Sequence, residues 1–482
     1  MRRYSWILVF LCLSASVVLA QPAASPAPKQ AKMTTPPSPL RIDWDQVNAE
    51  ATRRLAEYIR IDTSNPPGNE IRGVEWLKQI FQAEGIPFET GESAPGRASI
   101  VARLKGTGKE PALVLLSHID VVPVNREFWT VDPFAGVIKD GYLWGRGSVD
   151  MKPLGIASLE TFLLLHRNHV PLRRDVIFLG TADEEAGGNY GAGWVVKSRP
   201  QWIAGAKFLI TEGANSVADD SGKALYFGVG IAEKTPAWLK LTAKGRAGHG
   251  SIPNPDSSVN HLVAALERLR TYRPPLQVTP SVEYAFRTNA PYEPEPWRSR
   301  FADIRAFIQT PGAYEELLKR PVVLAKLENT INITGLEGSI KVNIVPSAAS
   351  ALLDCRLLPG TTIEQWVQQI RKIIQDDSIT VEVVVNFPPT ESKVDTPLYV
   401  AIERAVKQFY PSAGVVGFVS GGFTDSHFFR EQGITSYGFM PFPMKQEDWI
   451  RTHGNDERIP VNAFTGGVRL LWEIVYDFSR AQ

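Results

Sequence analysis

Two histidines and several carboxylates stand where a chain could gather metal ligands. The candidates are His118, Asp120, Asp150, Glu184, Glu185, Glu212 and His453, and nearly all of them follow an apolar run or a glycine-rich turn. Ligands of open α/β sheets bind at the carboxyl ends of strands, so these residues are candidates for one shared site. Imidazole and carboxylate without cysteine suit zinc, with cobalt or manganese as alternatives.

Each of these residues also has an ordinary structural explanation. A carboxylate after a strand often caps the next helix, which alone would account for Asp150 or Glu184. A single loop histidine is usually not a ligand, so it is the joint occurrence that favours a metal site. His118 and Asp120 are one residue apart and would face the same side of an extended chain. One could then bind a metal while the other orients the imidazole.

The stretch LGTADEEAGG places Glu184 and Glu185 side by side, and two glycines follow almost at once. Adjacent like charges repel each other, so their presence at a strand end calls for an explanation. Neighbouring side chains on an extended strand point in opposite directions, and on a turn they also diverge. The pair is therefore better suited to two tasks than to one. The alternative is that one glutamate only caps the following helix.

The elements that must position these residues alternate between helices and strands. Helical spacing covers 44–60, 73–84 and 154–165, and short apolar runs indicate strands at 99–104, 112–117, 176–181 and 208–211. This alternation predicts an α/β domain with a mostly parallel central sheet.

The pattern changes near Lys234. Strands are expected at 238–243, 330–334, 348–353 and 380–385, with helices at 258–269 and 363–374. From 396 the α/β pattern resumes, with a helix to 409 and a strand at 435–439. We therefore predict a catalytic domain in two parts, 41–233 and 394–482, interrupted by an inserted α+β domain at 234–393.

Composition is that of a soluble globular enzyme. The 482 residues allow two or more domains, 44% are hydrophobic and 21% are charged. The net charge of +1 gives no indication of a nucleic-acid partner. Of the two cysteines, Cys12 lies in the apolar stretch near the N-terminus, which we expect to be removed. Cys355 is then the single cysteine of the mature chain, and we expect it to be a small buried residue rather than half of a disulfide.

The N-terminus has the features of a secretory signal peptide. Arg2 and Arg3 precede an apolar stretch that ends Val18-Leu19-Ala20. An uncleaved anchor is the alternative, but the stretch is short for a membrane span and contains two serines. We expect a signal peptide at 1–20, a Pro/Ala-rich linker at 21–40, and a secreted or periplasmic protein without membrane attachment after cleavage.

The order of these motifs resembles a known family. His118-x-Asp120, Gly145-Arg146-Gly147-x-x-Asp150-x-Lys152, Glu184-Glu185, Glu212-Gly213 and His453 are similar to the motifs of the M20 metallopeptidases. The stretch WTVDPFAGVIKDGYLWGRGSVDMK is most similar to the branch of carboxypeptidase S and the N-fatty-acyl-amino-acid hydrolases.

The resemblance implies a site with two zinc ions. Asp150 would bridge the ions, His118 and Glu212 would hold one, and Glu185 and His453 the other. Glu184 would be the general base, and Asp120 would be the partner of His118. Two ions that share a water explain why five acids gather in one place.

The resemblance also assigns the inserted domain as a lid. His249 in GRAGHGSIP would donate to the oxyanion, often across a homodimer, and Asn343 and Arg356 would bind substrate. Gly422 would lie close to the substrate. Asp425 and His427 nearby are given structural roles, because the family's ligand set is already complete.

These features predict a secreted dizinc amidohydrolase that cleaves an amide bond next to a free carboxylate, as in an N-acyl amino acid or a peptide C-terminus. A dipeptidase or aminopeptidase of the same family is the enzymatic alternative, and a non-catalytic binding protein on this scaffold is the other. The stretch 272–320 is long for a lid and rich in proline. We expect it to cover the site and alter specificity.

Overall fold

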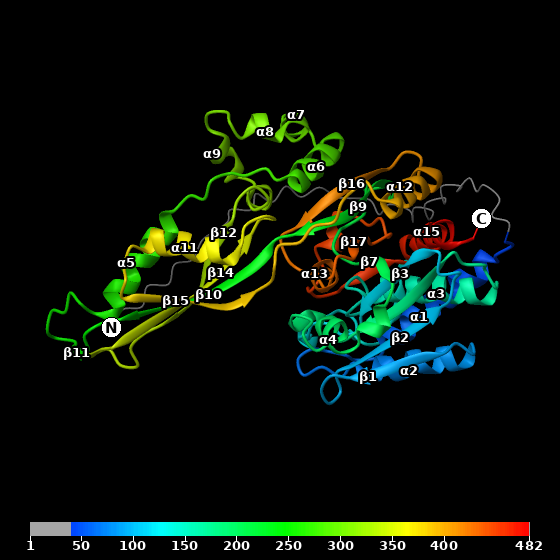
Figure 1. Cartoon of the computed structure of the whole chain (residues 1–482), viewed down its shortest axis with the longest axis horizontal. Coiled ribbons are helices and arrows are strands. Elements are labelled where there is room, and N and C mark those ends of the chain that lie inside the picture. The colour runs from blue at the N-terminus through cyan, green and yellow to red at the C-terminus, as the bar shows by residue number, and fades with distance from the viewer. Residues whose placement is uncertain (1–39, 482) are drawn as a thin grey trace, which may run out of the picture. The chain divides into compact units, whose positions relative to one another are not determined.

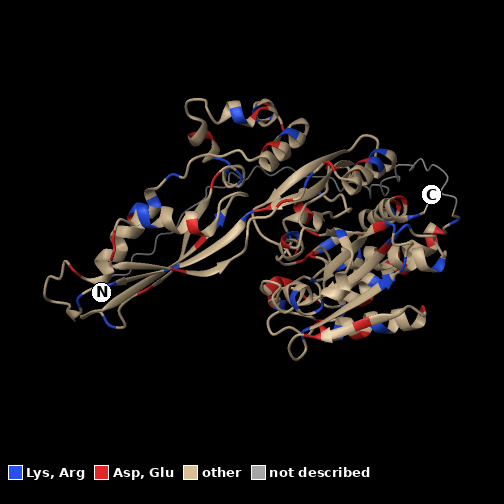
Figure 2. Cartoon of the chain, in the orientation of Figure 1, with Lys and Arg blue, Asp and Glu red and all other residues tan. Residues whose placement is uncertain are grey.

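The computed structural model describes residues 40–481 (Figure 1). The predicted signal peptide and nearly all of the predicted linker lie outside this range. Within it, no helix combines the length and the apolar character needed to cross a membrane. Figure 2 shows basic and acidic residues interspersed along the helices and strands rather than gathered on one element.

A mostly parallel sheet forms the centre of the catalytic domain, as predicted. Among the described residues it has nine strands in the order β1–β2–β6–β3–β7–β17–β9–β16, with β8 beside β9. β6, β3, β7 and β17 are parallel neighbours, whereas β1 and β2 are antiparallel. The strands are β1 (Phe88–Glu92), β2 (Ala98–Leu104), β3 (Glu110–His118), β6 (Arg174–Thr181), β7 (Ala206–Thr211), β8 (Val217–Ala218), β9 (Ala224–Glu233), β16 (Gly414–Ser420) and β17 (Thr435–Gly438).

Helices cover both faces of this sheet, which explains its continuous apolar strands. α3 (Lys152–Arg167) contacts β3 and packs between α1 (Trp44–Ile59) and α15 (Val461–Ser479). α4 (Ala192–Ser198) and α13 (Ser426–Glu431) contribute Val195 and Phe429 to an apolar cluster with β3 and β6. The remaining helices of this domain are α2 (Ile71–Ala83), α12 (Pro397–Phe409) and α14 (Gln446–Trp449).

A small antiparallel sheet brings together two distant stretches of the chain. β5 (Tyr142–Trp144) lies between β4 (Val137–Lys139) and β18 (Arg458–Pro460). Arg458 pairs with Trp144 and Pro460 with Tyr142. The loops that follow β5 and precede β18 are therefore held side by side.

The lid domain is built on a four-stranded antiparallel sheet in the order β12–β14–β10–β15. Its strands are β10 (Thr235–Lys244), β12 (Thr330–Glu337), β14 (Ala348–Leu357) and β15 (Ile379–Asn386). α5 (Ser258–Thr271) and α11 (Ile363–Ile374) bury alternate strand residues on one face, including Leu239, Leu353 and Cys355. Cys355 is fully buried, as expected.

The proline-rich stretch is helical rather than irregular. It forms α6 (Pro280–Asn289), α7 (Trp297–Ala302), α8 (Ile304–Phe307), α9 (Ala313–Leu317) and α10 (Pro321–Leu324) around an apolar core of its own. Prolines begin α6 and α10 and precede α7, positions at which the missing backbone amide is tolerated. Thr288 accepts from the Gly417 amide and Asn289 donates to its carbonyl, so the stretch covers the edge strand β16. Among the described residues it makes no hydrogen bond or ion pair with the predicted metal ligands.

Candidate active site

Three neighbouring parallel strands deliver ligands to one edge of the central sheet. β3 ends at His118, and Glu212 directly follows β7. β6 ends at Thr181 and leads into the short 3-10 turn η2 (Glu184–Ala186). Because adjacent parallel strands end at the same edge, these residues meet although they are far apart in sequence.

Asp150 and His453 reach this edge from the small sheet. Asp150 lies between β5 and α3, and His453 lies in the loop before β18. The buried carboxylate of Glu457 accepts from the amides of Val149 (2.6 Å) and Asp150 (3.1 Å) and from Nη1 of Arg146 (2.6 Å). Arg146 also donates to the His453 carbonyl, so one ion pair fixes both loops.

Asp150 lies between the two histidines. Its Oδ1 is 3.1 Å from Nε2 of His118, and its Oδ2 is 3.1 Å from Nε2 of His453. Glu212 is 3.4 Å from His118 Nε2, and Glu185 is 3.1 Å from His453 Nε2. The second oxygen of Glu185, Oε1, is buried without a hydrogen-bond partner among the described residues.

This arrangement fits two divalent ions that share Asp150. Neighbouring ligands of a tetrahedral zinc with bonds of about 2.0–2.1 Å lie roughly 3.3 Å apart, close to the contacts seen here. His118 Nδ1 donates to the carbonyl of Asp120 at 2.9 Å, so Nε2 is the ring nitrogen whose lone pair could bind an ion. The unpartnered Oε1 of Glu185 is a further donor atom that an ion would satisfy.

Proximity alone does not separate Glu184 from the ligands. One group of close donor atoms joins His118, Asp150 and Glu185, and another joins His118, Glu184 and Glu212. However, the carboxylate of Glu184 forms no ion pair or hydrogen bond among the described residues, whereas Glu212 contacts His118. We therefore treat Glu212 as the ligand candidate and Glu184 as the free carboxylate.

Without ions, burial and close contacts shift the pKa values of the cluster in both directions. Burial, together with the nearby Asp150, raises the pKa of Glu212 to about 8, and burial raises the pKa of Glu184 well above its ordinary value. Hydrogen bonds to Asp150 and Glu185 raise the pKa of His453 to about 10. Burial opposes ionisation of Asp150, but hydrogen bonds to both histidines outweigh it and lower its pKa. Divalent cations would replace these protons.

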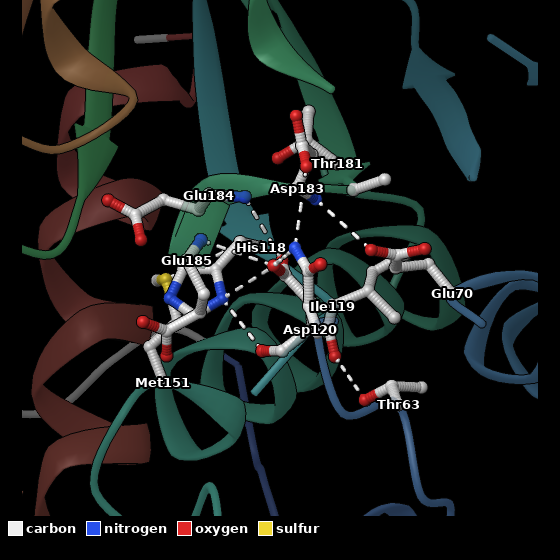
Figure 3. A network of polar contacts seen from close by, with 12 residues as sticks. Thr63, Glu70, His118, Ile119, Asp120, Met151, Thr181, Asp183, Glu184 and Glu185 are labelled. Atoms are coloured by element: carbon white, nitrogen blue, oxygen red, sulfur yellow. Dashed lines mark hydrogen bonds and ion pairs between the residues drawn. The ribbon is translucent and has the colours of Figure 1, made fainter. Parts of the chain in front are cut away.

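Asp120 connects His118 to the paired glutamates (Figure 3). Its Oδ1 is 3.6 Å from Nδ1 of His118, so the carbonyl of Asp120, not its carboxylate, is the nearer partner of the ring. The Asp120 carboxylate instead accepts from the amides of Glu184 (3.2 Å) and Glu185 (3.1 Å). Figure 3 shows the Glu184 and Glu185 side chains diverging from this turn.

The comparisons with known proteins agree with this site. Residues 114–477 match the model of peptidase family M20/M25/M40. The chain belongs to this family. It is 32% identical over 441 residues to the N-fatty-acyl-amino acid synthase/hydrolase PM20D1 of Xenopus tropicalis, covering 90% of this chain and 82% of that protein. It is also 28% identical over 429 residues to aminoacylase-1 of Sus scrofa, covering 87% and 93% of the two chains.

A solved structure shares the fold of this M20 enzyme. The M20 family metallo-carboxypeptidase Sso-CP2 from Sulfolobus solfataricus superimposes with a TM-score of 0.67 at 18% identity. The match covers 89% of this chain and 99% of that one. Family membership makes the chain a hydrolytic enzyme of the metallopeptidase and amidohydrolase group, and not a binding protein on a hydrolase scaffold.

Two predicted lid residues of the M20 enzyme lie together on an exposed ribbon. β11 (Gly248–His249) pairs with β13 (Ile344–Val345), and the amide of Gly250 donates to the carbonyl of Asn343 at 2.9 Å. His249 is exposed, and its Nδ1 contacts Ser251 Oγ at 2.8 Å. Among the described residues, neither His249 nor Asn343 contacts the ligand cluster.

Arg356 already has a carboxylate partner in the same strand. Its Nε donates to Asp354 Oδ1 at 2.7 Å and its Nη2 to Oδ2 at 3.1 Å. Its guanidinium lies 5.9 Å from the ring of Trp238 and 5.7 Å from that of Phe423. The third nitrogen, Nη1, is buried without a partner among the described residues. The N–H groups on the Nη1 and Nη2 side of the guanidinium, the end of the fork, are therefore available to bind a further carboxylate.

The remaining candidates lie around the turn that contains Gly422. This glycine is exposed, and a Cβ there would meet only Ser420 Oγ within 4 Å, so space beside it is open. Asp425 accepts from Thr181 Oγ1 at 3.0 Å. His427 contacts Glu431, stacks on Phe387 and packs against the tilted ring of Phe428, with both ring centroids 3.8 Å away. These partners fit the structural roles expected for both residues.

Sequence reasoning missed several residues that hold the site. Arg146 lies within a motif that was singled out and Glu457 lies shortly after His453, yet only the small sheet shows that they meet. A second group behind η2 consists of Asn65, Glu70, Arg97 and Asp183. The signal in each case is a polar or charged residue in a buried stretch, which needs a partner that sequence alone does not name.

Proposed function

We propose that this protein is a dizinc amidohydrolase that cleaves an amide bond next to a free carboxylate. The observation that carries the proposal is Asp150, which offers one oxygen to each of two histidines while Glu184 stands unpaired beside them. His118 and Glu212 would hold one ion, and Glu185 and His453 the other. Cobalt or manganese would suit the same donors.

The chain's own residues account for the proton transfers. Two ions bound at the cluster would lower the pKa of a water between them and polarise the amide carbonyl. Glu184 takes a proton from the attacking water as the oxygen of that water bonds to the carbonyl carbon. Glu184 then gives this proton to the leaving nitrogen as the C–N bond breaks, which releases a carboxylate and an amine.

The lid residues define the proposed substrate class. Arg356 would hold the free carboxylate through the end of its fork, because a planar guanidinium binds a carboxylate with two parallel hydrogen bonds. His249 would donate to the developing oxyanion, and Asn343 and Gly422 would contact the substrate. The names of the two relatives support N-acyl amino acids as substrates. We take 234–393 as the limits of the lid domain.

Metal analysis combined with matched substrates tests this function. We expect two zinc ions per chain, and hydrolysis of N-acyl amino acids in preference to dipeptides with a free amine. Each substrate is compared with its C-terminal carboxamide, which lacks the charge that Arg356 would bind. Preference for free-amine dipeptides would favour the dipeptidase or aminopeptidase alternative. A chain purified without metal that gains no activity with zinc would contradict the proposal.

We also propose that the protein is exported, because residues 1–20 have the features of a signal peptide. The mature protein should begin near Gln21 and appear in the secreted or periplasmic fraction. N-terminal sequencing of the fractionated protein checks this. A chain that retains Met1 and sediments with membranes would overturn it.

A further inference from the structure

A buried polar network lies directly behind the turn that bears Glu184 and Glu185. Asn65, Glu70, Asp120 and Asp183 are each no more than 3% exposed, and Arg97 is 9% exposed. Three of the five are carboxylates, so the network concentrates negative charge where water cannot screen it. Buried charges are costly unless they are paired, so removing one member of this network leaves its partner buried and unpaired.

Asp183 begins the turn in a strained conformation. Its φ is 75°, in the left-handed region that residues with a Cβ seldom adopt. Its carbonyl accepts from the amides of Ala186 (3.1 Å) and Gly188 (2.7 Å), and its side chain accepts from the amide of Tyr190 (2.8 Å). The direction in which the next two side chains leave the backbone therefore depends on Asp183 keeping this conformation.

Arg97 forms an ion pair with the Asp183 carboxylate. Its Nη2 donates to Asp183 Oδ1 and to Glu70 Oε1, both at 2.7 Å. Glu70 in turn accepts from the amide of Asp183 at 3.3 Å (Figure 3). Arg97 and Glu70 thus hold Asp183 by its carboxylate and by its backbone at once.

Asn65 joins this group to Asp120. Its Nδ2 donates to Asp120 Oδ2 at 2.8 Å and lies 3.4 Å from Asp183 Oδ1. The backbone of Asn65 is itself held, since its amide donates to the Val121 carbonyl at 2.9 Å. Because Asp120 accepts from the amides of Glu184 and Glu185, the network forms hydrogen bonds with the turn at Asp183 and at both glutamates.

We propose that Arg97, acting through Asp183, is a positioning residue that sets where the Glu184 and Glu185 carboxylates stand. The proposal rests on the proposed function for the roles of those two glutamates. Among the described residues Arg97 forms no hydrogen bond or ion pair with the predicted metal ligands; it keeps the left-handed residue from relaxing and turning both carboxylates away. Loss of a contact that orients a metal ligand from behind commonly lowers metal affinity or activity about 10–100-fold.

The test compares Arg97→Met with a matched variant elsewhere. Arg54 is also a buried arginine between two carboxylates, Glu50 and Glu160, at 2.7 Å from each, and it lies on α1 away from the turn. Arg54→Met should destabilise the protein without moving the turn. Any effect seen in both variants is therefore the general cost of removing a buried ion pair.

Two readouts need no substrate, so they remain valid if the proposed hydrolysis is wrong. In Arg97→Met, hydrogen exchange at the amides of Glu184 and Glu185 should accelerate at least about tenfold under conditions that favour the native state. Zinc affinity, measured by competition with a chelator, should fall roughly 10–100-fold. On hydrolysed substrates kcat should fall with KM little changed. Arg54→Met should alter none of these.

A double-mutant cycle and a conservative variant complete the test. Asp183→Asn combined with Arg97→Met should do little more than Arg97→Met alone, because both break one contact. Arg97→Lys keeps the charge but not the planar fork, so it should show smaller changes in the same direction and serves if Arg97→Met does not fold. The proposal would be overturned if hydrogen exchange and zinc affinity changed no more in Arg97→Met than in Arg54→Met. It would also be overturned if the effect of the double variant equalled the product of the two single effects.

Discussion

The ligand cluster and the lid ribbon differ in how firmly the fold holds them. At the cluster, His118 is 2% exposed. Hydrogen bonds of the buried Glu457 and Arg146 hold the loops of Asp150 and His453, and the Asp120 carboxylate accepts from the backbone amides of the turn that bears Glu184 and Glu185. On the ribbon, His249 and Asn343 are exposed, and β11 and β13 have two residues each. The residues of the proposed metal site are therefore held in place by the fold, whereas the lid residues proposed to act with them are not.

This difference separates two kinds of catalytic task. Metal ligands and a general base must hold their geometry before substrate arrives, and buried hydrogen bonds provide that. A residue that meets substrate only during catalysis can sit on a mobile or shared element. Substitutions in the cluster should therefore affect metal and chemistry, whereas lid substitutions should affect chemistry or binding alone.

The largest effect on turnover is expected for Glu184→Gln. The amide keeps the size of the side chain but cannot take a proton, so kcat should fall by about 10²–10⁴. Both zinc ions should stay bound, because Glu184 pairs with neither histidine. Zinc per chain and kcat are measured on the same preparation. Full activity, or loss of an ion, would show that Glu184 is not the base.

Glu185→Gln should separate the paired glutamates. It removes a ligand charge beside His453, so affinity for one ion should weaken about a hundredfold and activity should fall with it. Excess zinc should restore part of that activity, in contrast to Glu184→Gln. A titration of activity against free zinc, run on both variants, gives the comparison. Two tightly held ions in an active Glu185→Gln enzyme would contradict the assignment.

Much of the cluster was predictable because its residues follow recognisable strand ends. The expected runs at 112–117, 176–181 and 208–211 lie within β3, β6 and β7. Parallel neighbours end at one edge, so His118, Glu184–Glu185 and Glu212 could be grouped before the fold was known. The order of the motifs then pointed to the family and to separate roles for Asp150 and His453.

The supporting contacts were not predictable, because they depend on long-range pairing. Nothing near Arg97 in sequence names Asp183 as its partner, and nothing near Arg146 names Glu457. The stretch 272–320 was expected to cover the site; in the structure its helix α6 packs on β16, and its other short helices share an apolar core with α6. Composition identified it as unusual without showing where it would pack.

His249→Ala tests the lid side of the comparison. Loss of one oxyanion donor should lower kcat about a hundredfold while zinc content stays at the wild-type level. If His249 serves a partner's site, mixing His249→Ala with Glu184→Gln should restore activity, because one site of the mixed dimer is then intact. Wild-type activity in His249→Ala would remove it from the mechanism. Light scattering on the same samples reports whether a dimer forms.

The smallest effect, on KM alone, is expected for Arg356→Ala. A hydrogen bond to a charged group contributes roughly 1.5 kcal/mol at a partly exposed position, so KM for carboxylate substrates should rise about tenfold. Asp354 complicates this variant, because without Arg356 its charge would stand alone and repel the substrate. The double variant Arg356→Ala/Asp354→Asn removes that repulsion and isolates the lost cation. If Arg356 binds the carboxylate, the double variant should still show a raised KM for the acid, whereas its KM for the matched carboxamide should equal that of wild type. A double variant with wild-type KM for both substrates would mean that the single substitution acted through Asp354, and that the carboxylate is recognised elsewhere.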